Sequence, residues 1–158
     1  MIKSLLFIIV VFLALAGSPS YAGEEEIVGP VTREAILERK PDWRVAVAAY
    51  QPRPEVVDRI RGLAREVRME VYFGSWCPDC AAHLPAFFRI LELADTPLLK
   101  VSYIGVPQSK DKRGPYCTER QIARVPTFVV FVDGREIGRI VETPEKSLEE
   151  DLAKILGL

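Results

Sequence analysis

The chain has 158 residues, 49% of them hydrophobic, and this length suits one well-buried domain but not two ordinary ones. Its formal net charge is −1, and its 21 Lys and Arg residues are scattered among 22 acidic ones rather than gathered into a basic block. Because nucleic-acid binding relies on a basic field, we expect no nucleic-acid partner.

The first residues have the pattern of a secretory signal peptide. Lys3 supplies one positive charge, residues 5–16 form an unbroken apolar run, and small residues lead up to Ala22. The alternative is an uncleaved membrane anchor. However, about a dozen apolar residues fall short of the roughly 20 that span a bilayer, and Pro19 ends the run. We therefore expect residues 1–22 to be cleaved off, the protein to be exported to the periplasm or another extracytoplasmic space, and membrane attachment only without cleavage.

Residues 23–54 are expected to form a leader followed by a helical extension. A short flexible leader is predicted at residues 24–30. A helix is predicted at residues 32–39, with Thr32 as its N-cap. Residues 43–50 combine valines that alternate as in a strand with alanines that favour a helix, and we favour the helix.

Residues 55–158 alternate between helical and strand patterns. A strand, helix and strand over residues 69–106 predict a parallel pair, and Asp133-Gly134 marks the turn of an antiparallel hairpin. These elements predict one α/β domain with a mixed sheet of about four strands and helices on both faces. Helices are predicted at residues 55–67, 81–93, 118–123 and from 143 to near the C-terminus, strands at 69–73, 98–106, 127–132 and 135–141, and a surface loop at 107–115.

Export changes the interpretation of the cysteines, because an oxidising compartment permits stable disulfides. The chain has three cysteines, which cannot all pair with one another. Cys77 and Cys80 are separated by two residues, and Cys117 is left over. An odd count that includes a Cys-x-x-Cys pair favours a reactive pair over a disulfide-stapled scaffold.

The stretch Trp76-Cys77-Pro78-Asp79-Cys80 lies between a run of β-formers and a helical run, so it is expected at a strand-to-helix turn. A thiol at a helix N-terminus lies beside unsatisfied N–H groups and the positive end of the helix dipole, which favour the thiolate. Cys77 is therefore the candidate nucleophile. Cys80, one turn further along, can attack a mixed disulfide at Cys77 or close a disulfide with it.

Two residues between the cysteines tune this chemistry. Pro78 fits the first helical turn, where its missing N–H is no loss. Asp79 places a negative charge near Cys77, which opposes the stabilisation of a thiolate by the helix. A less stabilised thiolate disfavours the reduced form, so we expect the pair to act as a reductant more than as a strong oxidant.

Other interpretations of the pair remain open. It could be a structural disulfide, or half of a zinc site that His83 and Cys117 would complete, since a closed zinc site needs four ligands. His83, the only histidine, is more simply a packed or partly exposed helix residue. Cys117 is more simply a buried or idle thiol than half of a regulatory or intermolecular disulfide. We favour redox chemistry and expect neither a metal nor another cofactor.

The whole pattern resembles the thioredoxin superfamily. This resemblance implies a thioredoxin fold for residues 55–158, thiol–disulfide oxidoreductase activity, and protein substrates that contain disulfides or thiols, together with an unidentified redox partner. We expect a monomer. The alternative is a metal carrier or a non-catalytic binding module or chaperone that uses the same pocket. The residues that carry the resemblance are Phe73, the motif from Trp76 to Cys80, Pro85, Val125-Pro126-Thr127-Phe128 and Asp133-Gly134.

The resemblance also implies roles for residues outside the cysteine motif. In the family, the proline at the position of Pro126 is cis and lies beside the active-site disulfide. Val125 would then present its backbone N–H and C=O groups to an extended substrate segment. Trp76 would flank the thiol as a flat apolar contact. Trp76, Val125 and Pro126 are therefore the expected substrate-binding residues.

One position departs from the family pattern. Thioredoxins have a buried aspartate six residues before the first cysteine, which helps to deprotonate the second cysteine, and here Val71 occupies that position. Glu70 is its neighbour, but strand alternation directs Glu70 to the opposite face. We therefore expect resolution by Cys80 to be slower, or to use water or a carboxylate elsewhere.

Overall fold

A computed structural model gives the fold of residues 25–158, so the predicted signal peptide at residues 1–22 lies outside the described part of the chain. Five strands form one sheet in the order β1-β3-β2-β4-β5. β2 and β3 run parallel and the other neighbours run antiparallel, which confirms the mixed sheet, with one strand more than expected. The strands are β1 (Gly29–Val31), β2 (Val67–Phe73), β3 (Leu99–Gly105), β4 (Thr127–Val132) and β5 (Arg135–Val141).

Helices flank this sheet, and none of those described is long and apolar enough to cross a membrane. α2 covers most of residues 43–50, for which we favoured a helix. Thr32 caps α1 as predicted: its hydroxyl accepts a hydrogen bond from the backbone N–H of Ala35 at 3.2 Å. The helices are α1 (Arg33–Arg39), α2 (Pro41–Ala49), α3 (Pro54–Arg61), α4 (Pro78–Ala94), α5 (Gly114–Cys117) and α6 (Leu148–Leu156), with a 3₁₀ turn η1 (Lys110–Lys112).

The helix predicted at residues 55–67 is shorter than expected. α3 ends at Arg61 and is followed by Gly62, a residue that loses much conformational entropy in a helix. Val67 already pairs with Leu99 in the sheet and is fully buried. The Val67 side chain continues the apolar spacing of the predicted helix, but the residue belongs to β2.

The segment between β3 and β4 also differs from the prediction. The helix predicted at residues 118–123 is wrong, because the helical turns η1 and α5 form earlier, inside the predicted loop at 107–115. Pro115 gives the physical reason, since proline is tolerated in the first turn of a helix and so fixes the start of α5 at Gly114.

The final helix begins at Leu148 and not near residue 143. Ser147 is its N-cap, and the Ser147 hydroxyl accepts a hydrogen bond from the backbone N–H of Glu150 at 3.3 Å. Thr143 and the proline after it gave a competing start signal. The chain instead turns between β5 and α6 before the helix can begin.

The predicted flexible leader is part of the fold from residue 25 onward. It contributes β1, which pairs with β3, and Ile27 before this strand is buried. The backbone N–H of Ile27 donates to Ser75 Oγ at 3.0 Å, so the leader is joined to the turn that carries the cysteines. A Cβ atom at Gly105 would collide with the Ile27 carbonyl, which is why this close approach requires glycine.

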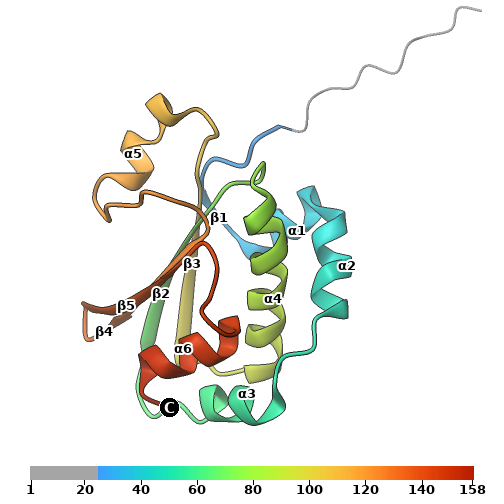
Figure 1. Cartoon of the computed structure of the whole chain (residues 1–158), viewed down its shortest axis with the longest axis vertical. Coiled ribbons are helices and arrows are strands. Elements are labelled where there is room, and N and C mark those ends of the chain that lie inside the picture. The colour runs from blue at the N-terminus through green and yellow to red at the C-terminus, as the bar shows by residue number, and fades with distance from the viewer. Residues whose placement is uncertain (1–24) are drawn as a thin grey trace, which may run out of the picture.

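The helices are divided unevenly between the two faces of the sheet. Aromatic rings of α2 and α4 pack on one face, with centroid distances of 6.2 Å from Trp43 to Phe73 and 5.1 Å from Phe87 to Phe128. α6 lies against β5 on this same face. Figure 1 shows α1, α2 and α4 on one side of the strands and only the η1–α5 segment on the other. We expected helices on both faces of the sheet. On the second face, the η1–α5 segment is the only helical structure among the described residues (Figure 1).

Ion-paired side chains cover much of the second face. The Glu70 carboxylate accepts hydrogen bonds from Arg120 Nε at 2.8 Å and from the Tyr72 hydroxyl at 3.0 Å. The guanidinium groups of Arg68 and Arg120 lie 4.9 Å and 5.2 Å from the centroid of the Phe131 ring. Their flat, weakly hydrated groups shield Phe131, which is buried without a helix above it.

Candidate active site

The two paired cysteines lie where β2 passes into α4. The backbone N–H of Cys77 donates to the Gly74 carbonyl at 3.1 Å and closes the turn, and Cys77 is the N-cap residue of α4. Its carbonyl accepts from the backbone N–H of Ala81 at 3.1 Å, which is the first helical hydrogen bond. Pro78 occupies the first turn without the loss of an N–H donor. The predicted strand-to-helix turn is therefore confirmed.

The two thiols have different surroundings. Cys77 is 7% exposed, whereas Cys80 is fully buried, and both are free thiols. Burial raises the pKa of Cys80 well above its usual range, and the neighbouring Cys77 and the charge of Asp79 act in the same direction. The Gly74 N–H, which donates to Cys80 Sγ at 3.3 Å, acts in the opposite direction. Substrate can therefore reach Cys77 first, and Cys80 needs help to lose its proton.

A second chain segment meets Cys77 from across the fold. The Cys77 thiol donates to the Val125 carbonyl at 3.4 Å, and the peptide bond between Val125 and Pro126 is cis. The Pro126 carbonyl in turn accepts from the backbone N–H of Glu142 at 2.7 Å. The structure thus brings the expected backbone-binding residues Val125 and Pro126 next to the candidate nucleophile Cys77, although 48 positions separate Val125 from Cys77.

Trp76 is held in place by contacts on several sides. Its indole N–H donates to the Val106 carbonyl at 2.9 Å, and a Cβ atom at Gly74 would collide with the ring. The Arg113 guanidinium lies 5.0 Å from the ring centroid. Sequence reasoning singled out neither Gly74 nor Arg113. A glycine just before the motif was a usable signal for a close contact, but nothing local indicated that Arg113 would reach Trp76.

The remaining candidate residues lie at the edge of the site or outside it. Pro78 and Asp79 are exposed on the first turn of α4, and His83 is partly exposed further along the helix. Cys117 is buried in α5, and burial raises its pKa while Arg113 partly opposes this effect. Among residues 25–158 no group of three or more Cys, His, Asp or Glu side chains could hold a metal ion, so the zinc site that His83 and Cys117 would complete does not form.

The position of the expected buried base is apolar. Val71 is fully buried on the face where α4 packs. Glu70 points to the other face, as strand alternation predicted. Burial opposes ionisation of Glu70, but the hydrogen bonds from Arg120 and Tyr72 outweigh this effect and lower its pKa. Glu70 is therefore an ionised partner of Arg120 and not a base for Cys80.

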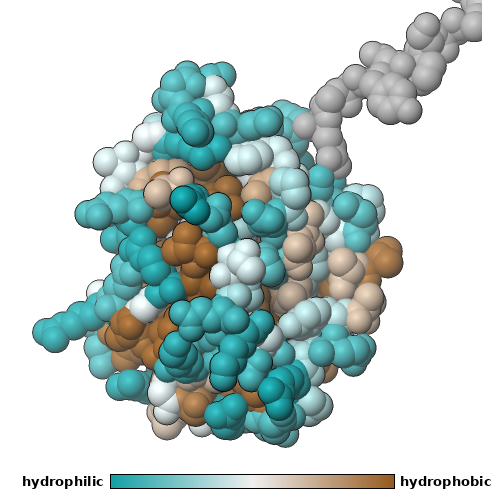
Figure 2. Space-filling view, viewed as in Figure 1, coloured by the Kyte–Doolittle hydropathy of each residue, from teal (hydrophilic) through white to brown (hydrophobic). Residues whose placement is uncertain are grey.

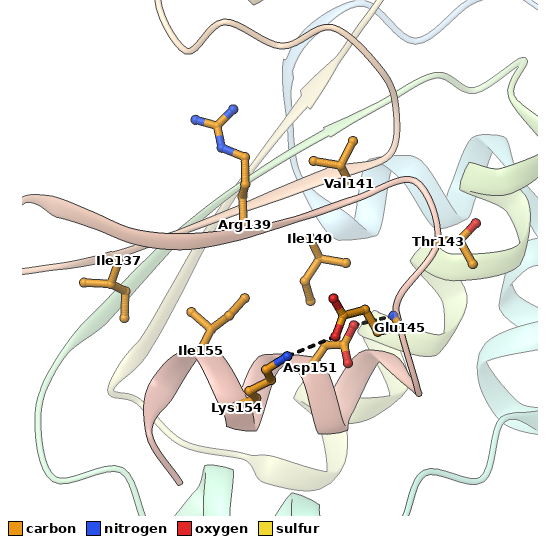
Figure 3. A pocket seen from close by; sticks show the side chains of 9 residues that line it. All are labelled: Ile137, Arg139, Ile140, Val141, Thr143, Glu145, Asp151, Lys154 and Ile155. Atoms are coloured by element: carbon orange, nitrogen blue, oxygen red, sulfur yellow. Dashed lines mark hydrogen bonds and ion pairs between the residues drawn. The ribbon is translucent and has the colours of Figure 1, made fainter.

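The candidate site is a surface feature rather than a deep cavity. A hollow of about 500 Å³ lies elsewhere, between β5 and α6 (Figure 3), and contains none of the site residues. Ile137, Ile140 and Ile155 point toward one another there, beside an ion pair between Lys154 and Glu145 at 2.9 Å. A site outside such a hollow suits a protein substrate better than a small enclosed ligand.

Paired thiols at a helix N-terminus, beside a cis-proline and on a mixed α/β sheet, define a protein of the thioredoxin class. The thioredoxin family model matches residues 33–153, and the chain belongs to this family. Family and fold together support thiol–disulfide oxidoreductase chemistry in general, and the family implies protein substrates that contain thiols.

Individual relatives are distant. Thioredoxin AMT13 of Alternaria alternata is 29% identical over 86 residues, which cover 54% of this chain and 67% of that protein. A thioredoxin of Chlamydia pneumoniae is 24% identical over 81 residues, covering 51% of this chain and 74% of the relative. A solved protein of unknown function from Pseudomonas aeruginosa has a TM-score of 0.54 at 19% identity, with 78% of this chain and 81% of that chain covered. This last likeness shows the fold alone.

Proposed function

We propose that this protein is an exported thiol–disulfide oxidoreductase that works as a disulfide reductase. The observation that carries the proposal is the difference between the two thiols. Cys77 lies at the N-cap of α4, is 7% exposed and contacts the Val125 carbonyl, whereas Cys80 is fully buried one turn further along. This arrangement suits one thiol that attacks a substrate and a second thiol that attacks only the first.

The reaction has two exchange steps. The Cys77 thiolate attacks one sulfur of a substrate disulfide, the S–S bond of the substrate breaks, and its other sulfur leaves as a thiolate that takes up a proton. Cys80, once deprotonated, attacks the Cys77 sulfur, and the second substrate sulfur leaves in the same way. The substrate gains two electrons and two protons, and the protein is left with a disulfide between Cys77 and Cys80. A dithiol partner must reduce this disulfide before the next cycle.

Val125 and Trp76 are the proposed substrate contacts. An extended substrate segment can pair with the backbone at Val125, beside which the Cys77 thiol lies. Trp76, fixed by its hydrogen bond to the Val106 carbonyl, offers a flat apolar surface to the residues that flank the substrate disulfide. Both contacts orient the disulfide toward Cys77.

The second step is the slower one in this proposal. Burial raises the pKa of Cys80, and Val71 provides no carboxylate to accept its proton. The Gly74 N–H stabilises negative charge on Cys80 Sγ, and water that enters with the substrate must take the proton.

The charge of Asp79 supports the proposed direction, reduction of substrate disulfides. The signal-peptide pattern of residues 1–22 supports the proposed export. Asp79 lies in the first turn of α4, where its charge contributes to the raised pKa of Cys80 and disfavours the thiolate form. Equilibration with a glutathione buffer measures the reduction potential of the Cys77–Cys80 pair. We expect a potential well below about −120 mV, and a value as oxidising as that would contradict the reductase assignment.

Reduction of a protein disulfide in the presence of dithiothreitol tests the activity. The wild type should accelerate it, and Cys77→Ser should abolish the acceleration because the attacking sulfur is gone. Cys117→Ser is the matched control and should leave the rate unchanged. Wild-type activity in the double variant Cys77→Ser, Cys80→Ser would refute the proposal.

A further inference from the structure

Three cations lie on one short turn, and the last of them contacts Trp76 of the candidate active site. They are Lys110 and Lys112 of η1 and Arg113 directly after it, and we refer to these three residues as the basic turn. The segment 107–124 that contains them has five of the 21 Lys and Arg residues but only two of the 22 acidic residues, in a chain whose net charge is −1. Positive charge is therefore concentrated here. Figure 2 shows the segment as a hydrophilic projection at the top of the molecule.

Arg113 fixes the basic turn against the site. Its Nε atom donates to the Pro107 carbonyl at 2.9 Å, and its Nη2 atom donates to the Gln108 carbonyl at 3.0 Å. Its guanidinium also lies 5.0 Å from the centroid of the Trp76 ring. Because Trp76 directly precedes Cys77, these contacts of Arg113 place the turn that carries the three cations next to the candidate active site.

The charges of the basic turn are available to a partner, unlike the other cations of the segment. Arg120 is paired with Glu70 at 2.8 Å, and Arg124 is paired with Glu142 at 2.7 Å. Lys110 and Lys112 are exposed, and no ion pair within residues 25–158 involves either of them. The segment therefore pairs Arg120 and Arg124 with carboxylates, whereas the two lysines of the basic turn have no ion pair within residues 25–158.

The acidic groups near the basic turn do not remove its positive charge. Asp111 lies between the two lysines, and its carboxylate accepts a hydrogen bond from the Ser109 hydroxyl. Glu26 of the leader accepts a weak hydrogen bond from the backbone N–H of Gln108 at 3.4 Å. Neither carboxylate forms an ion pair with a lysine of the turn, so the three cations outnumber these two acidic groups.

We propose that the basic turn is a docking surface for an acidic segment that flanks the disulfide of the protein substrate. This proposal rests on the proposed reductase function and specifies the substrate class for the same site. Opposite charges raise the rate of productive encounter and select against partners with basic flanks. Because the cations are exposed, the attraction should act mainly on association and should weaken as salt is added.

Two disulfide peptides that differ only in acidic or basic flanking residues test the proposal. The wild type should reduce the acidic peptide with a kcat/KM at least about threefold higher than the basic one, in line with a few exposed charge pairs. This ratio should fall toward one in about 0.5 M salt. In the variant Lys110→Glu, Lys112→Glu the ratio should fall to one or invert, while kcat stays near the wild-type value. An equal kcat/KM for both peptides in the wild type would overturn the proposal.

The matched control reverses the same number of charges at the other end of the sheet. Lys100→Glu, Arg135→Glu changes residues near the start of β3 and β5, far from the Cys77 end of β2, and should keep the wild-type ratio. An equal loss in this control would contradict docking at the basic turn. Serine-substituted peptides, which have no disulfide, separate docking from redox chemistry. If the acidic one binds more tightly by indole fluorescence while neither disulfide peptide is reduced, the reductase proposal fails and the docking proposal stands.

Discussion

The two faces of the sheet differ in what stabilises them and in what they can contribute to the chemistry. Val71 lies on the apolar face on which α4 packs, whereas Glu70, the residue before it, lies on the face covered by ion pairs. Alternation along β2 alone separates these two side chains. A carboxylate one position away in sequence is therefore unable to replace the base that the site lacks, because the sheet lies between it and Cys80.

The largest effect should come from a cavity in the helix-covered face. Phe128 is fully buried, with its ring centroid 5.1 Å from that of Phe87, and Phe128→Ala should lower the free energy of unfolding by about 3 to 5 kcal/mol. Denaturant unfolding measures the loss. The control Ile137→Ala, on the exposed edge strand β5, should change it far less. Equal losses at both positions would contradict the placement of Phe128 in the packed core and of Ile137 at its exposed edge.

The sequence was sufficient for the elements whose signals are local. The hairpin turn at Asp133-Gly134, the cap at Thr32 and the helix that begins after Cys77 all follow from residue types at fixed positions. β1 was missed because a three-residue strand becomes stable only by pairing with β3. The start of α6 was misplaced because Thr143 gives as good a cap signal as Ser147, and packing against β5 decides between them.

In the candidate site, too, features with a local sequence signal were predicted, and features that depend on tertiary contacts were not. The proposed roles of Cys77 and Cys80 follow from the local motif, whereas the position of Pro126 was expected only through the family resemblance. The contact between Arg113 and Trp76 could not be predicted, because it depends on how the segment after β3 folds back. The separation of Glu70 from the site was predicted, since it needs only the period of a strand.

A smaller loss of stability is expected from the charged face. Glu70→Ala should cost about 1 to 3 kcal/mol, because it leaves Arg120 and the Tyr72 hydroxyl without their shared acceptor. Thermal or denaturant unfolding measures the change, and Glu119→Ala, at an exposed neighbour of Arg120, is the control. A loss as large as that of Phe128→Ala would contradict the contrast between the two faces.

A carboxylate on the helix-covered face should speed the second exchange step. Val71→Asp should raise the rate of Cys80 attack on a mixed disulfide by roughly tenfold, because a positioned general base can accept the Cys80 proton. Val71→Asn has a similar size without a base and serves as the control. Stopped-flow measurement of release of the second substrate thiol gives the rate. Equal rates in the two variants would mean that proton loss from Cys80 does not limit resolution.

The smallest expected effect is the pH dependence of the stability that Glu70 contributes on the charged face. The pKa of Glu70 is lowered in the folded state, so its contribution is complete above the ordinary Glu value and is lost as pH falls through the lowered folded value. Over this acidic range the wild type should therefore lose more stability than Glu70→Gln, whose side chain does not titrate. Parallel curves for the two proteins would show that Glu70 is not held by Arg120 as described.

The most direct test of the account is to trap the first intermediate. A reduced Cys80→Ala variant, mixed with a disulfide peptide, should form one mixed disulfide per chain, and peptide mapping should locate it at Cys77, the more exposed thiol of the pair and the N-cap of α4. This result would identify Cys77 as the nucleophile and Cys80 as the thiol that normally resolves the adduct. An adduct at Cys117, or no adduct under conditions in which the wild type reduces the peptide, would contradict it.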